Sequence, residues 1–192
     1  VVVCTATEIK TKKSYFNEIN VVAVTELSTH LDYEDLVEDH KIGEGGFGVV
    51  FKGTFKGNKV AIKKMKGNFE VEKQMTEFKR EVDMLDKFRN EYIVHFFGAV
   101  FIPGKISMVT EFANYGSLQD LMKKRDKPSQ HLRIKFLLDG AKGLSYLHNN
   151  SILHRDIKPD NLLVFSLDDS VMINAKLTDF GSARNVNLLL SN

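Results

Sequence analysis

The chain has 192 residues, of which 43% are hydrophobic and 27% are charged, and its formal net charge is +2. These values are typical of one globular domain with a short flank, and they exclude a disordered chain or a protein that binds nucleic acid or an anionic membrane through its net charge. The longest apolar runs, residues 19–24 and 96–102, are far too short to span a membrane. The single cysteine excludes an internal disulfide framework and favours a reducing compartment.

Residues 1–35 contain no motif for phosphate or metal. β-branched runs at 1–3 and 19–24 predict short strands, and we interpret 1–35 as a flank or as the end of a preceding module. The chain begins with Val rather than Met, and no charged region precedes an apolar one. We therefore expect a piece of a longer protein, without a signal peptide.

From Leu36 onward the sequence predicts strands around one helix. Residues 49–55 and 59–63 have strand composition, and a Gly57-Asn58 turn between them predicts a hairpin. Apolar residues then recur every three or four positions, which predicts one face of a helix: Val71, Met75, Phe78, Val82, Leu85 and Phe88.

A second strand pair is expected at 93–102 and 105–112, with its turn at Pro103-Gly104. Ser117 and Asp120 have the spacing of a helix cap, which predicts a short helix after this pair.

The last part of the chain is predicted to be mainly helical. Residues 162–165 and 174–177 read as two short strands around an irregular loop. Before them, one apolar stripe predicts a longer helix: Ile134, Leu137, Leu138, Ala141, Leu144 and Leu147.

Residues 43–48 match the pattern G-x-G-x-x-G, with Gly43, Gly45 and Gly48 at the glycine positions. Glycines there let backbone N–H groups approach a phosphate closely, in conformations that other residues resist. A dinucleotide-binding domain shares this pattern but continues into a helix. Here the last glycine opens a strand, which favours a phosphate loop between two strands. A glycine-rich hairpin without a ligand is the alternative for this motif alone.

Lys63 and Ala61 share one face of the predicted strand, because side chains alternate along a strand. A small residue beside a long cation leaves room for a flat base while the ammonium group reaches a phosphate. Glu81 falls at the edge of the apolar face of the predicted helix, and an inward-facing carboxylate needs a partner. Lys63 is the natural partner. The alternatives are an exposed strand lysine and a solvated glutamate.

Two further blocks contain acceptor oxygens and carboxylates. One runs from His154 to Asn161 with the sequence H-R-D-I-K-P-D-N, and the other is Asp179-Phe180-Gly181. Carboxylate and amide oxygens suit Mg²⁺, and a carboxylate near an attacking hydroxyl can orient it and accept its proton. An unrelated polar turn is implausible for the first block, because four motifs occur in a consistent order.

Together these blocks, the glycine loop and Val60-Ala61-Ile62-Lys63 resemble the motifs of the eukaryotic protein kinase superfamily over about residues 36–192. The resemblance implies an α+β, protein-kinase-like two-lobe fold. The β-rich N-lobe with one helix would cover about 36–112, the hinge about 111–116 and a helical C-lobe about 117–192. We expect this C-lobe to be truncated after the Asp-Phe-Gly motif.

The same resemblance implies the catalytic roles. Asp156 would accept the proton of the substrate hydroxyl, and Lys158 would neutralise the transferred phosphoryl group, which favours Ser/Thr specificity. Lys63 and Glu81 would hold the phosphates of ATP. Two residues would bind Mg²⁺: Asn161 and Asp179.

Residues 108–112, followed by Tyr115-Gly116-Ser117-Leu118, resemble the hinge of tyrosine-kinase-like serine/threonine kinases. Thr110 would be the gatekeeper beside adenine. The expected ATP-binding set is Ile42, Gly43, Gly45, Gly48, Val50, Ala61, Lys63, Thr110, Glu111, Ala113 and Leu163. Leu85, Phe96, His154 and Phe180 would stack as a spine between the lobes. The long spacing from Asn161 to Asp179 departs from the family, and we interpret it as an elongated surface turn.

We therefore expect an ATP- and Mg²⁺-dependent protein serine/threonine kinase whose partners are ATP and protein substrates, not nucleic acid. We expect a cytoplasmic location, which includes the cytosolic part of a larger, membrane-attached receptor kinase. The alternative is a truncated fragment that acts as a nucleotide-binding or interaction module, an expectation that rests on the end of the sequence at Asn192, soon after Gly181. A dinucleotide oxidoreductase has only the glycine motif in its favour.

Overall fold

The computed structural model describes residues 3–6, 19–22, 29–45, 48–66, 71–124 and 127–186. In the flank, β1 (Val3–Ala6) and β2 (Ile19–Val22) pair antiparallel. β2 lies within the β-branched run 19–24, whereas β1 shares only Val3 with the run 1–3. No helix in the described ranges has the length and apolar character needed to cross a lipid bilayer.

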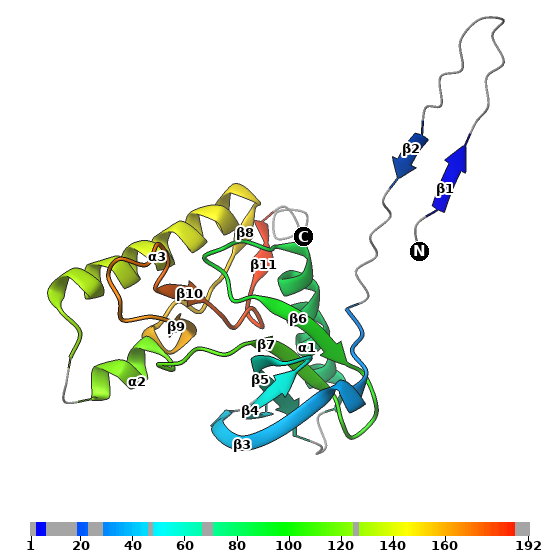
Figure 1. The fold of residues 1–192 in the computed structure, drawn as a ribbon, viewed down its shortest axis with the longest axis horizontal. Helices are drawn as coiled ribbons and strands as arrows, with labels where there is room; N and C mark the ends of the chain where they lie inside the picture. The colour runs from blue at the N-terminus through cyan, green and yellow to red at the C-terminus, as the bar shows by residue number, and fades with distance from the viewer. Residues whose placement is uncertain are drawn as a thin grey trace, which may run out of the picture.

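The first lobe is built on five antiparallel strands in the order β3-β4-β5-β7-β6 (Figure 1). Their bounds are β3 (Leu36–Gly45), β4 (Gly48–Phe55), β5 (Asn58–Met65), β6 (Phe96–Val100) and β7 (Ser107–Glu111). Both predicted strand pairs are therefore present, and the turn at Pro103-Gly104 is where the sequence predicts it.

The turn between β4 and β5 lies one residue earlier than predicted. Lys56 and Gly57 occupy it, with φ of 47° and 82°, while Asn58 already belongs to β5. Two consecutive positive φ values make the right-handed twist of the turn match that of the strands, which is the geometry of a two-residue hairpin. Gly57 adopts this conformation at no steric cost, whereas Lys56 is a non-glycine residue that adopts it at a cost.

Helix α1 (Val71–Lys87) packs one face against the sheet and the second lobe, as its apolar stripe predicts. Phe78, Val82 and Leu85 are all at most 5% exposed, and Glu81 on the same face is 6% exposed. The side chain of Val71, the first residue of the predicted stripe, lies outside the described part of the chain.

In its described part, the second lobe contains two α-helices and several short strands. α2 (Leu118–Lys123) begins with the predicted cap, because Ser117 and Asp120 each accept a hydrogen bond from the other's backbone N–H. The remaining elements are α3 (Gln130–Asn149), β8 (Ile152–Leu153), a 3-10 turn at Pro159–Asn161, β9 (Leu162–Val164), β10 (Ala175–Leu177) and β11 (Arg184–Asn185). β9 pairs with β10, and β8 pairs with β11.

The residues that predict α3 are mostly not the ones that pack. Ile134, Leu137 and Leu138 are 58%, 62% and 51% exposed. The packed face contains two glycines instead: a Cβ on Gly143 would lie 2.9 Å from a methyl of Leu177, and Gly140 faces Leu162. The other buried residues of this face are Leu132, Phe136, Asp139 and Leu147. Glycine brings the helix axis close to β9 and β10, a contact that a search for large apolar residues overlooks.

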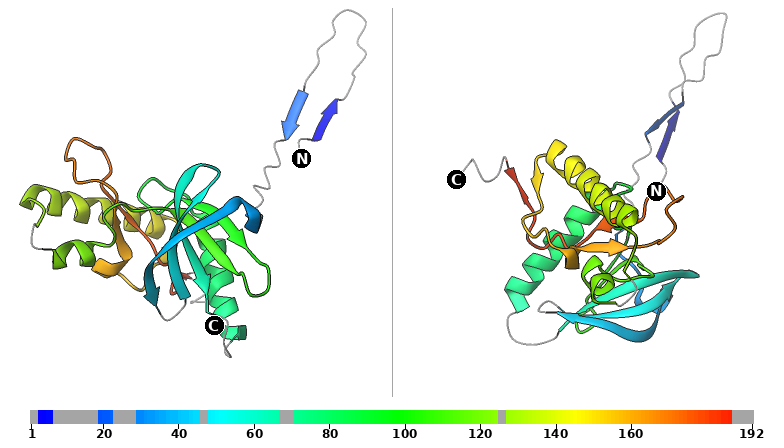
Figure 2. Two further views of the ribbon diagram at one scale, coloured as in Figure 1. Left: turned by 60° about the horizontal axis from the view of Figure 1, so that its bottom comes forward. Right: turned by 90° about the vertical axis from the view of Figure 1, so that its left-hand side faces the viewer.

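The two lobes meet along β9 and β10. In Figure 2, right, the five-stranded sheet lies below and α3 lies above, with these short strands between them. Among the residues that the structure describes, twenty buried ones from both lobes form one continuous hydrophobic cluster, which includes Phe78, Leu85, Phe136, Leu147 and Phe180. A continuous core across the two lobes holds the elements between them in register.

Candidate active site

A cavity of about 270 Å³ lies between the sheet and the second lobe. Ten residues that line it were predicted from the sequence: Ile42, Val50, Ala61, Lys63, Glu81, Thr110, Glu111, Ala113, Asn161 and Leu163. The predicted Asp179 lines it as well. Five more lining residues were not predicted as ligands: Leu85, Met108, Phe112, Gly116 and Thr178. The strand register would have indicated Met108 as a lining residue, because Met108 on β7 pairs directly with Lys63 on β5.

The glycine motif forms the β3–β4 hairpin above this cavity, but none of its glycines lines the wall. A Cβ on Gly48 would lie 2.0 Å from the carbonyl oxygen of Lys64, so this glycine is required for strand packing. A Cβ on Gly45 would meet nothing within 4 Å, and one on Gly43 only the Cβ of Val50. Open space above these two positions leaves backbone accessible to a ligand. The tip, residues 46 and 47, lies outside the described residues.

Lys63 on β5 and Glu81 on α1 form the predicted ion pair, with 2.7 Å between Nζ and Oε2. Burial lowers the pKa of Lys63, but the negative charges of Glu81 and Asp179 outweigh this effect and leave the pKa raised. Burial raises the pKa of Glu81, and the charge of Lys63 opposes that shift. The lysine ammonium therefore stays charged on the wall of the cavity, where an anion can reach it.

Asp156 is held by two partners on the loop before β9. Its Oδ2 accepts hydrogen bonds from Lys158 Nζ at 2.7 Å and from Asn161 Nδ2 at 2.9 Å. Asn161 also donates to the backbone oxygen of Asp156 at 2.8 Å. The hydrogen bond from Lys158 is the main cause that lowers the pKa of Asp156. The carboxylate is thus ionised and fixed in orientation at neutral pH.

His154 connects this loop to the Asp-Phe-Gly segment. It is 1% exposed, and its ring lies 5.1 Å from that of Phe180. Nδ1 accepts the backbone N–H of Asp156, so the neutral ring carries its proton on Nε2 and donates it to the carbonyl oxygen of Thr178 at 3.0 Å. Burial lowers the pKa of His154, which favours this neutral form. The residues expected to form a spine, Leu85, Phe96, His154 and Phe180, are each at most 3% exposed.

Asp179 has a left-handed backbone, with φ of 64°, and it follows the carbonyl that His154 binds. Its carboxylate accepts the backbone N–H of Gly181 at 3.4 Å. Asn161 lines the cavity from the 3-10 turn just before β9, and Asp179 lines it from just after β10; β9 and β10 pair with each other. The backbone of Thr178 donates to the carbonyl oxygen of Asn161 at 3.1 Å, so the two segments stay together.

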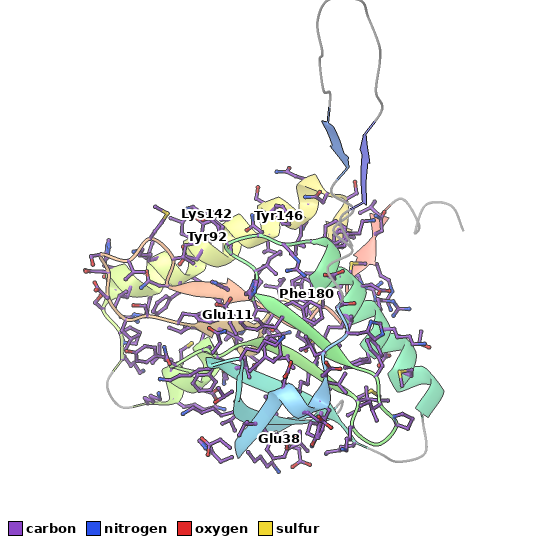
Figure 3. The ribbon with its side chains drawn as sticks, turned by 45° about the vertical axis from the view of Figure 1, so that its right-hand side comes forward. Glu38, Tyr92, Glu111, Lys142, Tyr146 and Phe180 are labelled. Carbon is purple, nitrogen blue, oxygen red and sulfur yellow. The ribbon has the colours of Figure 1, made fainter. Side chains whose placement is uncertain are left out.

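Glu111 also links the two lobes through its side chain. Its Oε1 accepts from the backbone N–H of His95 at 2.6 Å and from Lys176 Nζ at 2.7 Å. Figure 3 labels Glu111 and Phe180 in the region between the sheet and the second lobe. The sequence predicts Glu111 only as a member of the expected ATP-binding set, and no pattern links it to Lys176, because the two residues are 65 positions apart in the chain.

Residues 36–189 match the family model described as protein kinase domain. The chain belongs to the protein kinase family. One relative comes from Acanthamoeba polyphaga mimivirus and is named as the serine/threonine-protein kinase/receptor R818. It is 42% identical to this chain over 156 residues, covering 80% of this chain and 9% of R818. Two relatives come from Dictyostelium discoideum. Probable serine/threonine-protein kinase gdt9 is 34% identical over 206 residues, covering 91% of this chain and 13% of gdt9. Dual specificity protein kinase shkB is 38% identical over 148 residues, covering 75% of this chain and 22% of shkB.

These relatives are far longer than this chain, which spans at most 22% of the length of the three named here. The match confirms the resemblance to the protein kinase superfamily and the two-lobe α+β fold. The observed β-rich first lobe with its single long helix α1, followed by the helical second lobe, agrees with that fold (Figure 1).

Proposed function

We propose that this chain carries the ATP site of a kinase that transfers the γ-phosphoryl group of ATP to serine or threonine hydroxyls of proteins. One observation supports this proposal above the others. The Lys63–Glu81 pair, Asn161 and Asp179 come from four separate segments of the chain and face one cavity next to the fixed carboxylate of Asp156. Phosphoryl transfer depends mainly on positioning and on charge stabilisation, and these are the groups that supply them.

Adenine would lie against the apolar wall of the cavity. Ile42 and Val50 line it from the sheet side, and Leu163 lines it from β9. Backbone groups of Glu111 and Ala113 would bind the base edge, beside Thr110 as gatekeeper. A flat base between two apolar surfaces, with polar backbone at one edge, is the usual form of such a site.

The donor groups at the inner end of the cavity fit Mg²⁺. Asn161 and Asp179 supply amide and carboxylate oxygens, which a hard cation prefers. Within the described residues, no three His, Cys, Asp or Glu side chains gather into a metal cluster. This suits Mg²⁺, because protein sites usually hold it through one or two carboxylates together with nucleotide phosphates and water. When bound, the ion would neutralise charge on the phosphates.

Asp156 would orient the substrate hydroxyl and accept its proton, since its carboxylate is ionised and aimed by Lys158 and Asn161. The Lys158 ammonium would then leave part of its contact with Asp156 to stabilise the transferred phosphoryl group. Lys63 would hold ATP phosphates while Glu81 keeps its ammonium in place. We propose Ser/Thr specificity because of Lys158 and because the mimivirus relative and gdt9 are named as serine/threonine-protein kinases. We propose a cytoplasmic site of action because of the single cysteine.

The test measures Mg-ATP binding by this chain and phosphate transfer to a generic protein substrate by the parent protein. We expect Lys63→Met to weaken Mg-ATP binding and Asp156→Asn to lower transfer by about 100-fold or more, as for loss of a general base. Lys59→Met and Asp160→Asn are matched controls, because both side chains are exposed on the same strand and the same loop. Undiminished transfer by Asp156→Asn would refute the assignment.

A further inference from the structure

Residues 29–31, which precede the residues matched to the kinase family, lie along the open edge of β6. The backbone N–H of Leu31 donates to Ala99 at 2.9 Å, and that of Ala99 donates to Thr29 at 2.6 Å. His30 and Ala99 form a parallel bridge. The segment therefore extends the sheet at the edge opposite β3, and the chain then crosses to begin β3 itself (Figure 1).

The edge of β6 is shaped for this segment. Gly98 has φ of 151°, and a Cβ at this position would lie 2.7 Å from both the Cγ of Leu31 and the carbonyl oxygen of Thr29. Side chains do not approach so closely, so glycine is the residue that lets residues 29–31 lie flat on the strand. This close fit is independent of the backbone hydrogen bonds.

A line of aromatic contacts leads from the segment to α1. The rings of His30 and Phe101 have centroids 4.8 Å apart, and Phe101 meets Phe78 edge-on at 5.8 Å. Phe78 is 5% exposed and lies on α1 three residues before Glu81, so the two side chains share one face of the helix. Both centroid separations fall in the range of aromatic pairs, and the Phe101–Phe78 pair has the favoured edge-to-face geometry.

We propose that residues 29–31 are positioning residues for the phosphoryl-transfer site. By packing on β6 and Phe101 they hold α1 in the position at which Glu81 meets Lys63. They act through Phe101 and Phe78, since none of the three is among the residues that line the cavity. The consequence for catalysis rests on the proposed function, whereas the mechanical link from His30 to α1 can be measured without it.

The first experiment measures hydrogen exchange of the α1 amides in the full chain without nucleotide. His30 is exposed, so His30→Ala removes the ring contact without opening the core. We expect exchange in α1 to become about 2- to 10-fold faster, the range that corresponds to loss of one aromatic pair. His30→Phe should restore slow exchange. His40→Ala is the matched control, because His40 is an exposed histidine of β3 that pairs with Asp39. Unchanged exchange in α1, or an equal increase throughout the chain, would overturn the proposal.

The second experiment measures the affinity for a non-hydrolysable Mg-ATP analogue, with His30→Ala and Glu81→Gln made singly and together. We expect His30→Ala to weaken binding about 2- to 10-fold alone, and by less than about twofold when Glu81→Gln is present, because the segment acts through Glu81. Equal effects in both backgrounds would overturn the proposal. If the unchanged chain bound no nucleotide, the proposed function would fail, and hydrogen exchange would still decide the positioning role.

Discussion

Replacing Glu81 by Gln removes the charge that faces Lys63 and keeps the shape of the side chain. The two side chains are 8% and 26% exposed and lie 2.7 Å apart, so the variant leaves a largely buried ammonium without its main partner. Breaking a buried pair costs about 3–5 kcal/mol, and we expect about 2–3 kcal/mol because Asp179 also stabilises the charge on Lys63. The melting temperature should fall by roughly 4–12 °C.

The assay is thermal or urea unfolding of the full chain as a double-mutant cycle with Lys63→Met. The single Lys63→Met variant leaves the buried carboxylate of Glu81 without its partner, whereas the double variant removes both charges. The double variant should therefore be more stable than the sum of the single effects predicts, by at least about 1 kcal/mol. Asp83→Asn is the control, because Asp83 is an exposed carboxylate on the same helix. A coupling energy near zero would refute the view that the pair is a coupled unit.

Three further variants test other parts of the fold. His154 has a lowered pKa when folded, so the stability that its neutral form contributes is present above the unfolded pKa of about 6.5 and is lost as the pH falls below it. In unfolding experiments between pH 7.5 and 5, His154→Gln should therefore reduce the dependence of the free energy of unfolding on pH. An unchanged pH dependence would contradict the assignment. Gly143→Ala should lower the free energy of unfolding by about 1–3 kcal/mol because its Cβ would meet Leu177, whereas Gly45→Ala should change it far less; equal effects would argue against close packing of α3. Ser117→Ala should cost about 0.5–2 kcal/mol in the same assay through loss of the α2 cap, and no change would indicate that the capping box is not formed in solution.

The sequence predicted those features of the fold that depend on residues close together in the chain. The period of Phe78, Val82 and Leu85 predicted both α1 and its buried face. The spacing of Ser117 and Asp120 predicted a cap, and the structure contains it. The family match adds support to the motif-based view of a kinase, since the motifs lie in short stretches with fixed spacing.

The apolar stripe predicted the helix α3, but the sequence offered no prediction of the face that packs on the short strands. Ile134, Leu137 and Leu138 predicted α3 correctly but not the face that packs, because Gly140 and Gly143 bring the helix close to β9 and β10. A pattern of large apolar residues cannot report a contact that depends on the absence of a side chain.

Contacts between distant segments required the tertiary structure. Glu111 meets Lys176 across 65 positions, and His154 binds the carbonyl of Thr178 across 24. No local rule links such pairs, because their proximity follows from how the two lobes pack. The motif residues could therefore be named from their order in the chain. The convergence of Lys63, Glu81, Asn161 and Asp179 on one cavity depended on how the whole sheet and the second lobe fold around α1, and so did the docking of residues 29–31 on β6.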